Sequence, residues 1–86
     1  MTSATFDETQ FRGWLIERLA ARLGREPSAI DADTPLADYG LDSLYALAIV
    51  DDIEDYLGIA VDATMMWDHP SVAALTSALA TRITTA

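Results

Sequence analysis

Apolar residues recur every three or four positions in three long segments of this chain, and this spacing restricts the folds it can adopt. The segments cover residues 8–23, 43–57 and 72–84. Their spacing is the period of an α-helix that buries one face. A shorter apolar piece, residues 63–67, is expected to form another helix, and no stretch shows the two-residue alternation of a β-strand. The sequence therefore predicts an all-α fold, a small four-helix bundle with a long first loop and a short third helix.

Local capping signals set the ends of the first helix. Asp7 is followed three residues later by Gln10, a pair that resembles a capping box at a helix start. Phe6 and Phe11 have the spacing of a hydrophobic staple around the same start. Gly24 follows the last apolar residue of the segment and is a common helix stop. The first helix is therefore expected to end just before Gly24.

Similar signals bound the other predicted helices. Asp42 is placed to cap the second helix, and Gly58 follows the end of that helix. Asp62 can cap the short third helix, and Ser71 can cap the fourth. These four residues divide the second half of the chain into three helices with short links.

The segment between the first two helices, residues 24–42, is long for so small a protein. Pro27, Pro35 and Gly40 interrupt it, so a single helical turn at residues 28–30 is the most regular structure expected there. Long loops in small domains are usually functional or packed. Four apolar side chains are expected to anchor this loop to the helices: Ile30, Leu36, Tyr39 and Leu41.

Assigning about 100° per residue separates the second helix into two faces. Its core face is expected to contain Ala46, Ile49, Val50, Ile53 and Leu57. The outer face begins with apolar groups and becomes acidic farther along, a combination that favours docking of partner proteins. The residues expected to form this docking face are Leu44, Tyr45, Leu47, Ala48, Asp51, Glu54 and Asp55. In the third helix, at least two of Met65, Met66 and Trp67 are expected to pack inward.

Length and charge limit the class of protein. A chain of 86 residues suffices for one domain with one modest core, expected over residues 7–84 between short tails at 1–6 and 85–86. Fourteen acidic residues against five arginines give a net charge of −9, so neither nucleic acid nor an anionic membrane is an expected partner. The chain has no cysteine for a disulfide and no recognisable signal peptide or membrane span, which favours a cytoplasmic monomer.

The run Gly40-Leu41-Asp42-Ser43-Leu44 combines a turn, a helix cap and a serine hydroxyl. Gly40 can turn the chain sharply, and Asp42 can cap the helix that follows. Ser43 then lies on the first helical turn, near the positive end of the helix dipole, where an anion is favoured. The sequence therefore predicts a site at the start of the second helix.

This run resembles the attachment sequence of acyl carrier proteins of the polyketide and fatty-acid synthase type. The resemblance continues at Gly58, at Ala63-Thr64 and at Asp68-His69-Pro70-Ser71, and it extends more loosely over nearly the whole chain. It implies that Ser43 carries a 4′-phosphopantetheine arm, which a separate phosphopantetheinyl transferase installs from coenzyme A. The thiol of that arm would hold acyl intermediates as thioesters, so the protein would be a carrier and not an enzyme.

The resemblance also implies the partners of the protein. Besides the transferase, they would be an acyl-loading enzyme (an acyltransferase or an adenylating ligase) and a ketosynthase or other acyl-processing enzyme of a polyketide-like pathway. Asp42 would be recognised by the transferase as well as capping the helix. Ala48 stands where many acyl carriers have a glutamate, and Tyr45 adds a bulky group to the same surface. Val50 and Asp52 stand where modular polyketide carriers often have arginines, which favours a discrete carrier.

The sequence also permits other interpretations. An aminoacyl or peptidyl carrier of a non-ribosomal peptide pathway would share the attachment chemistry but not the cargo. In a different class, the chain would be an unmodified acidic helical interaction module, with Ser43 merely beginning a helix. The acidic loop is not expected to be a calcium-binding EF-hand, because Pro35 and Leu36 occupy the positions of a ligand and of the glycine. His69, the only histidine, is expected to make local hydrogen bonds.

Overall fold

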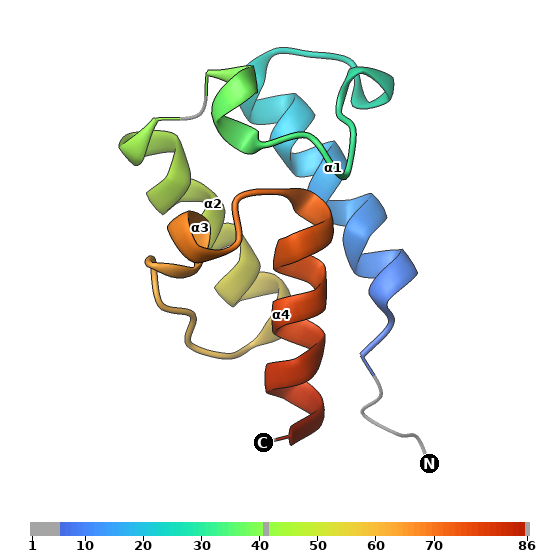
Figure 1. Cartoon of the computed structure of the whole chain (residues 1–86), viewed down its shortest axis with the longest axis vertical. Helices are drawn as coiled ribbons and strands as arrows, with labels where there is room; N and C mark the ends of the chain where they lie inside the picture. Colours follow the sequence, from blue (N-terminus) through green and yellow to red (C-terminus); the bar gives the residue numbers. More distant parts are fainter. Residues whose placement is uncertain (1–5, 41, 86) are drawn as a thin grey trace.

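The structure is a computed structural model, and it describes residues 6–40 and 42–85. Its four α-helices are α1 Glu8–Leu23, α2 Ser43–Leu57, α3 Met65–Asp68 and α4 Val72–Thr85 (Figure 1). Two short 3-10 helices, η1 Pro27–Ala29 and η2 Leu36–Tyr39, lie between α1 and α2. The described residues contain no β-strand. The predicted all-α fold, with its long first loop and short third helix, is therefore confirmed.

The ends of α1 and α2 agree with the predicted ones, and the caps explain this agreement. Asp7 Oδ1 accepts a hydrogen bond from the N–H of Gln10 at 3.0 Å, which closes the first turn of α1. Both helices end at a glycine in the left-handed conformation, with φ of 68° at Gly24 and 70° at Gly58. These are local signals, so each helix end depends on only a few neighbouring residues.

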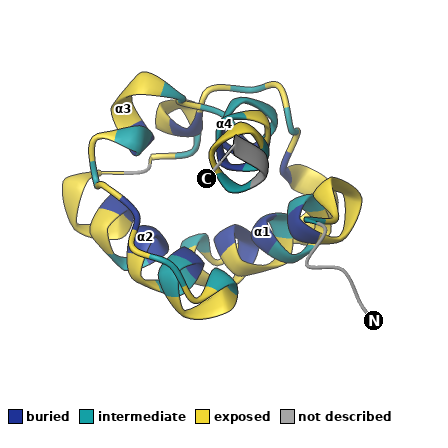
Figure 2. Ribbon diagram, turned by 90° about the horizontal axis from the view of Figure 1, so that it is seen from below, coloured by how far each residue is buried: buried dark blue, intermediate teal, exposed yellow. Residues whose placement is uncertain are grey.

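The buried faces of α1, α2 and α4 meet in one core (Figure 2). Side chains with almost no exposed surface include Phe11, Leu15, Leu19, Ile49, Ile53, Val72, Leu75 and Leu79. The predicted core face of α2 is confirmed: Ala46, Ile49, Val50 and Ile53 are buried, and Leu57 packs against them while partly exposed. Burial of apolar surface, at about 25 cal/mol per Å², holds these three helices together.

The long first loop is fixed to the beginning of α4. Ile30 and Leu36 are buried in the core, as predicted. The N–H of Leu36 donates to the carbonyl of Pro70 at 2.7 Å, and the N–H of Ala73 donates to the carbonyl of Ala32 at 2.8 Å. Together these contacts hold the loop in place where it approaches the start of α2.

Of the other two predicted loop anchors, Tyr39 is described by the structure and Leu41 is not. Tyr39 packs against the core while partly exposed, and its hydroxyl accepts a hydrogen bond from the N–H of Asp31 at 2.7 Å. Leu41 lies outside the described residues. The expected turn at residues 28–30 forms one residue earlier, because Pro27 has the fixed φ that begins a helical turn.

Two carboxylates organise the link between α2 and α3. Glu54 Oε2 accepts a hydrogen bond from the N–H of Val61 at 2.7 Å, and Asp62 Oδ1 accepts one from the N–H of Thr64 at 2.9 Å. The hydrogen bonds from the backbone and the hydroxyl of Thr64 lower the pKa of the Asp62 carboxyl. The prediction that Asp62 caps the third helix is therefore wrong: Asp62 closes a turn with Thr64, and Thr64 is the N-cap residue. Because this turn comes first, α3 begins at Met65, two residues later than predicted.

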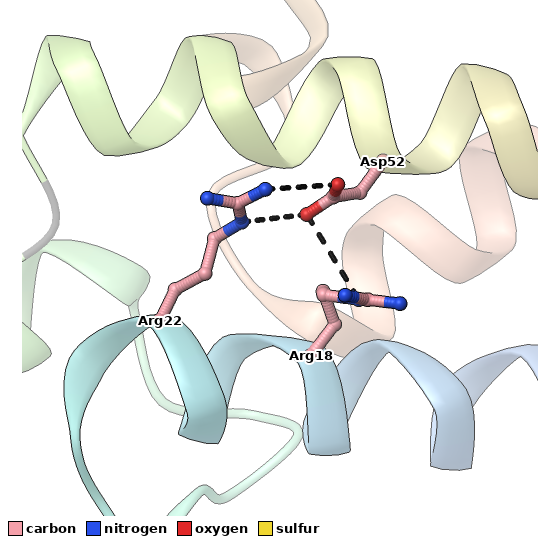
Figure 3. A network of polar contacts seen from close by, with 3 residues as sticks. All are labelled: Arg18, Arg22 and Asp52. Atoms are coloured by element: carbon pink, nitrogen blue, oxygen red, sulfur yellow. Dashed lines mark hydrogen bonds and ion pairs between the residues drawn. The ribbon is translucent and has the colours of Figure 1, made fainter.

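The α1–α2 seam, formed by Trp14, Arg18 and Arg22 of α1 and by Asp52 and Tyr56 of α2, joins these helices at the surface. Arg22 makes two hydrogen bonds to Asp52, from Nε to Oδ2 at 2.6 Å and from Nη2 to Oδ1 at 2.9 Å (Figure 3). Arg18 Nε lies 4.0 Å from the same carboxylate. The hydrogen bonding to Asp52 raises the pKa of the Arg22 guanidinium. Asp52 therefore links the two helices.

Candidate functional site

Ser43 is the first residue of α2, and the residues before it determine how it is presented. Gly40 ends η2 with a φ of 81°, a conformation that glycine adopts without strain and that turns the chain toward α2. Asp42 is the N-cap: its Oδ1 accepts a hydrogen bond from the N–H of Tyr45 at 3.0 Å. The predicted cap is confirmed. Ser43 itself is exposed.

The electrostatics at Ser43 suit an anionic group. The first hydrogen bond of α2 runs from the N–H of Ala46 to the carbonyl of Asp42 at 2.9 Å. The N–H groups of Ser43 and Leu44 precede it, so they lie at the helix end where the partial positive charge is concentrated. Among the described residues, no hydrogen bond involves the Ser43 hydroxyl. An exposed hydroxyl at a helix N-terminus fits a phosphodiester linkage.

Apolar side chains project from α2 next to Ser43. Leu44 is 76% exposed, Leu47 is 53% exposed and Tyr45 is 39% exposed. Leu44 and Leu47 each expose more than half of their surface, so together with Tyr45 they form an apolar patch beside Ser43. Ala48, the fourth apolar residue predicted for this surface, is half-buried.

The acidic residues of the predicted docking face divide into two kinds. Asp51 and Asp55 are exposed, and their carboxylates are accessible to a partner. Glu54 is half-buried, and its carboxylate accepts the hydrogen bond from Val61 described above. Two of the three predicted acidic side chains therefore present charge on the surface of α2, while the third also holds the link to α3.

Trp67 is a surface residue that the sequence analysis did not include in the docking face. Met66 is buried and Met65 packs against the core, which confirms that two of these three large side chains point inward. Trp67 is 60% exposed on α3, which crosses beside α2 in Figure 1. A helix of four residues is too short for its apolar period to define a face, so no sequence signal distinguished Trp67 from the two methionines.

The other sequence-predicted candidates make local contacts. His69 is half-buried, and its backbone N–H donates to the carbonyl of Met65 at 2.9 Å. Ser71 Oγ accepts a hydrogen bond from the N–H of Ala74 at 3.1 Å, so it caps α4 as predicted. Within the described ranges, no group of three or more His, Asp or Glu side chains could hold a metal ion, and no helix is long and apolar enough to cross a membrane.

Comparison with known families gives one extended match. The family described as the phosphopantetheine attachment site matches residues 13–79, which include the start of α2 and most of the bundle. The chain is also 35% identical over 80 residues to one component of the phenolphthiocerol/phthiocerol polyketide synthase of Mycobacterium tuberculosis. That alignment covers 93% of this chain but only 4% of the length of the synthase component.

Two solved structures have the same fold. The solution structure of the acyl carrier protein LipD from Actinoplanes friuliensis is 40% identical, with a TM-score of 0.76, and the match covers 100% of this chain and 98% of that one. The crystal structure of a free-standing peptidyl carrier protein from Acinetobacter baumannii is 31% identical, with a TM-score of 0.84 over 90% of this chain and 96% of that one.

The family match, the polyketide synthase relative and the shared fold lead to one conclusion. Members of this family take 4′-phosphopantetheine as a covalent group and act as carriers that are not themselves catalytic. The described geometry fits that group, because α2 begins with an exposed hydroxyl on the positive end of a helix. The chain belongs to the phosphopantetheine-binding carrier proteins, the family that includes the acyl carrier domains of polyketide synthases.

Proposed function

We propose that Ser43 is the attachment residue and that the protein carries intermediates of polyketide-like biosynthesis as thioesters. The observation that carries this proposal is the exposed Ser43 hydroxyl at the capped N-terminus of α2, inside the matched residues 13–79. In the modification, Ser43 Oγ forms a new bond to the phosphorus that bears the pantetheine of coenzyme A. The bond from that phosphorus to the adenosine bisphosphate breaks, and the hydroxyl proton leaves to a base of the transferase.

The residues around Ser43 have defined roles in this proposal. Asp42 holds the N–H of Tyr45, so the first turn of α2 is formed before the transferase arrives. The N–H groups of Ser43 and Leu44, which precede the first helical hydrogen bond of α2, would stabilise the negative charge of the phosphodiester once it is attached. The bound cofactor supplies a terminal thiol for thioester chemistry, which a chain without cysteine cannot supply itself.

The outer face of α2 and the adjacent Trp67 are the proposed docking surface for partner enzymes. Leu44, Leu47 and Trp67 would enter apolar pockets of a partner, since each residue exposes more than half of its surface. Asp51 and Asp55 would meet basic residues at the rim of that interface. The proposed partners are the phosphopantetheinyl transferase, an acyl-loading enzyme and a ketosynthase or other acyl-processing enzyme.

Intact-protein mass spectrometry tests the attachment residue. The protein is incubated with coenzyme A and a broad-specificity phosphopantetheinyl transferase, and its mass is expected to rise by one phosphopantetheinyl group. Ser43→Ala is expected to show no increment, and Ser28→Ala, which removes another exposed serine, is expected to be modified like the wild type. An unmodified wild-type protein would favour the interaction-module interpretation, and a modified Ser43→Ala variant would place the attachment elsewhere.

The aminoacyl or peptidyl carrier is the second candidate function, and the similarity to the free-standing peptidyl carrier protein of Acinetobacter baumannii favours it. The attachment chemistry is the same for both candidates, so only the cargo separates them. The modified protein is incubated with acyl-transferring enzymes and, separately, with amino-acid-adenylating enzymes. Acyl loading supports the first candidate, and aminoacyl loading without acyl loading supports the second.

A further inference from the structure

The α1–α2 seam exposes two aromatic rings at the surface, those of Trp14 and Tyr56. The rings of Trp14 and Tyr56 are stacked, with centroids 4.2 Å apart and planes 18° apart. Tyr56 is 40% exposed and Trp14 is half-buried, so the pair remains accessible from the surface. Phe11 lies behind them at centroid distances of 5.6 Å from Trp14 and 5.8 Å from Tyr56. This packing makes the pair a rigid platform.

Two of the hollows beside this platform are lined by Tyr56. One has a volume of about 480 Å³ and a mainly apolar lining that includes Phe11, Leu57 and Ile59. Its wall also contains Phe6, whose ring lies 5.3 Å from that of Phe11, as the predicted staple requires. Volumes of this size accept a large apolar side chain.

The second hollow has a volume of about 350 Å³ and is lined by Trp14, Arg18, Asp52, Asp55 and Tyr56. Asp52 is already bonded to Arg22, and Arg18 is held between that carboxylate at 4.0 Å and the Trp14 ring at 5.7 Å. The Asp55 carboxylate is exposed beside the Tyr56 ring and accepts no hydrogen bond from the described residues. An aromatic face next to a free carboxylate suits a cationic side chain.

The charges of the lining residues indicate that the bound partner segment is basic. The carboxylates that line the two hollows belong to Asp7, Asp52 and Asp55, and Arg18 is the cation in the lining. Arg22 also pairs with Asp52, so one negative charge remains in excess. The whole chain carries a net charge of −9, so an acidic partner would be repelled at longer range as well. Of the two basic residue types, arginine fits better, because its planar guanidinium stacks on rings and pairs with carboxylates.

We propose that the α1–α2 seam is a second protein-docking site, which binds a partner segment that carries a large apolar side chain next to an arginine. The apolar side chain enters the hollow lined by Phe11, Leu57 and Ile59, and the arginine lies over Tyr56 and pairs with Asp55. Tyr56 is thirteen residues beyond Ser43 in α2, so it lies about 20 Å from Ser43 along the helix axis. Asp55 is the one residue that the seam site shares with the docking surface proposed on the outer face of α2. A partner held at the seam therefore leaves the start of α2 accessible.

An NMR titration of the unmodified, ¹⁵N-labelled protein tests this site independently of Ser43. The probe is a short alanine-based helical peptide with a leucine and an arginine one turn apart, and the control peptide has glutamate in place of the arginine. Binding is expected to shift the indole N–H of Trp14 and the amides of Tyr56 and Leu57, with saturation only for the arginine peptide. Shifts confined to residues 43–48, equal binding of the glutamate peptide, or no shifts would each overturn the proposal.

Variants identify the groups that bind the probe. Asp55→Asn is expected to weaken binding by about two- to fivefold, the range of one exposed ion pair, because it keeps the shape but removes the charge. Asp51→Asn, one turn earlier and outside the hollow, is the matched control and is expected to change binding less than about twofold. Tyr56→Leu keeps an apolar group for packing but removes the ring, and about a fivefold loss is expected. Equal losses for Asp51→Asn and Asp55→Asn would overturn the assigned pairing with Asp55.

Discussion

The carboxylate of Asp42 acts on both the stability of α2 and the geometry of Ser43. Its Oδ1 accepts the N–H of Tyr45 at 3.0 Å. Asp42→Ala leaves that N–H without its partner, so the free energy of unfolding is expected to fall by about 1 kcal/mol. Asp42→Asn keeps an oxygen acceptor and is expected to lose only a few tenths of that value. Urea denaturation followed by circular dichroism measures both variants, and equal stability of Asp42→Ala and the wild type would contradict the capping role.

Single residues show where sequence reasoning succeeds and where it fails. The cap at Asp42 was predictable because its partner, Tyr45, lies three residues away in the same turn. Glu54 was expected on the docking face, but its carboxylate is half-buried and bonded to Val61, a contact that crosses the turn at Gly58 and has no sequence signal. The exposure of Trp67 was not predicted, because a helix of four residues is too short for its apolar period to define a face.

At the scale of elements, the seam between α1 and α2 depends on one bidentate ion pair. Both oxygens of Asp52 accept hydrogen bonds from Arg22, at 2.6 and 2.9 Å, and the Asp52 side chain is largely shielded from water. Asp52→Asn is expected to lower the free energy of unfolding by about 1 kcal/mol, the upper end for surface pairs, because two bonds are made.

A double-mutant cycle with Arg22→Gln checks this estimate. The double variant is expected to lose less free energy of unfolding than the sum of the losses in the two single variants. Added salt is expected to reduce this coupling energy, because it screens the ion pair. Arg18→Gln is the internal comparison and is expected to have a smaller effect, because its Nε lies 4.0 Å from the carboxylate. Fully additive losses in the cycle would show that the Arg22–Asp52 pair contributes nothing to stability.

The turn before α3 is expected to depend on pH. The Thr64 backbone and hydroxyl lower the pKa of Asp62 below its usual value of 3.8. The folded state therefore gains stability from this carboxylate at pH values above 3.8, and that gain is lost as the pH falls through the lower, folded-state pKa. The amide resonance of Thr64 is expected to move in acid in the wild type. In Asp62→Asn that movement is expected to disappear, and its persistence would assign the titration to another group.

The elements differ in how far they could be predicted, and the difference follows the range of their contacts. α1 and α2 were placed to the residue because their caps and glycine stops are local in sequence. η2 was not predicted, since it forms where Leu36 is buried and bonded to Pro70, more than thirty residues farther along the chain. The late start of α3 has a local cause instead, because the Asp62 carboxylate bonds to Thr64 two residues later and closes a turn before the helix.

At the scale of the whole molecule, the net charge of −9 is expected to govern encounters with partners. The rate of modification at limiting protein concentration is expected to fall by about tenfold when ionic strength rises from about 0.05 M to about 0.5 M, because attraction to a basic partner is screened. Initial rates of phosphopantetheinylation measure this dependence. A small peptide substrate of the same transferase is the control for direct effects of salt on the enzyme. An equal salt dependence for the peptide would contradict steering by the carrier.

The two tryptophans of the chain lie on different surfaces. Trp14 is stacked on Tyr56 in the α1–α2 seam, while Trp67 is exposed on α3. Because their environments differ, their fluorescence emission should differ in wavelength and in quenching by iodide. Replacing one of them with phenylalanine leaves a single tryptophan, which can be excited selectively at wavelengths where the three tyrosines absorb little. The variants Trp14→Phe and Trp67→Phe would therefore follow the arrival of a partner at α3 and at the seam separately in stopped-flow experiments, without any attached dye.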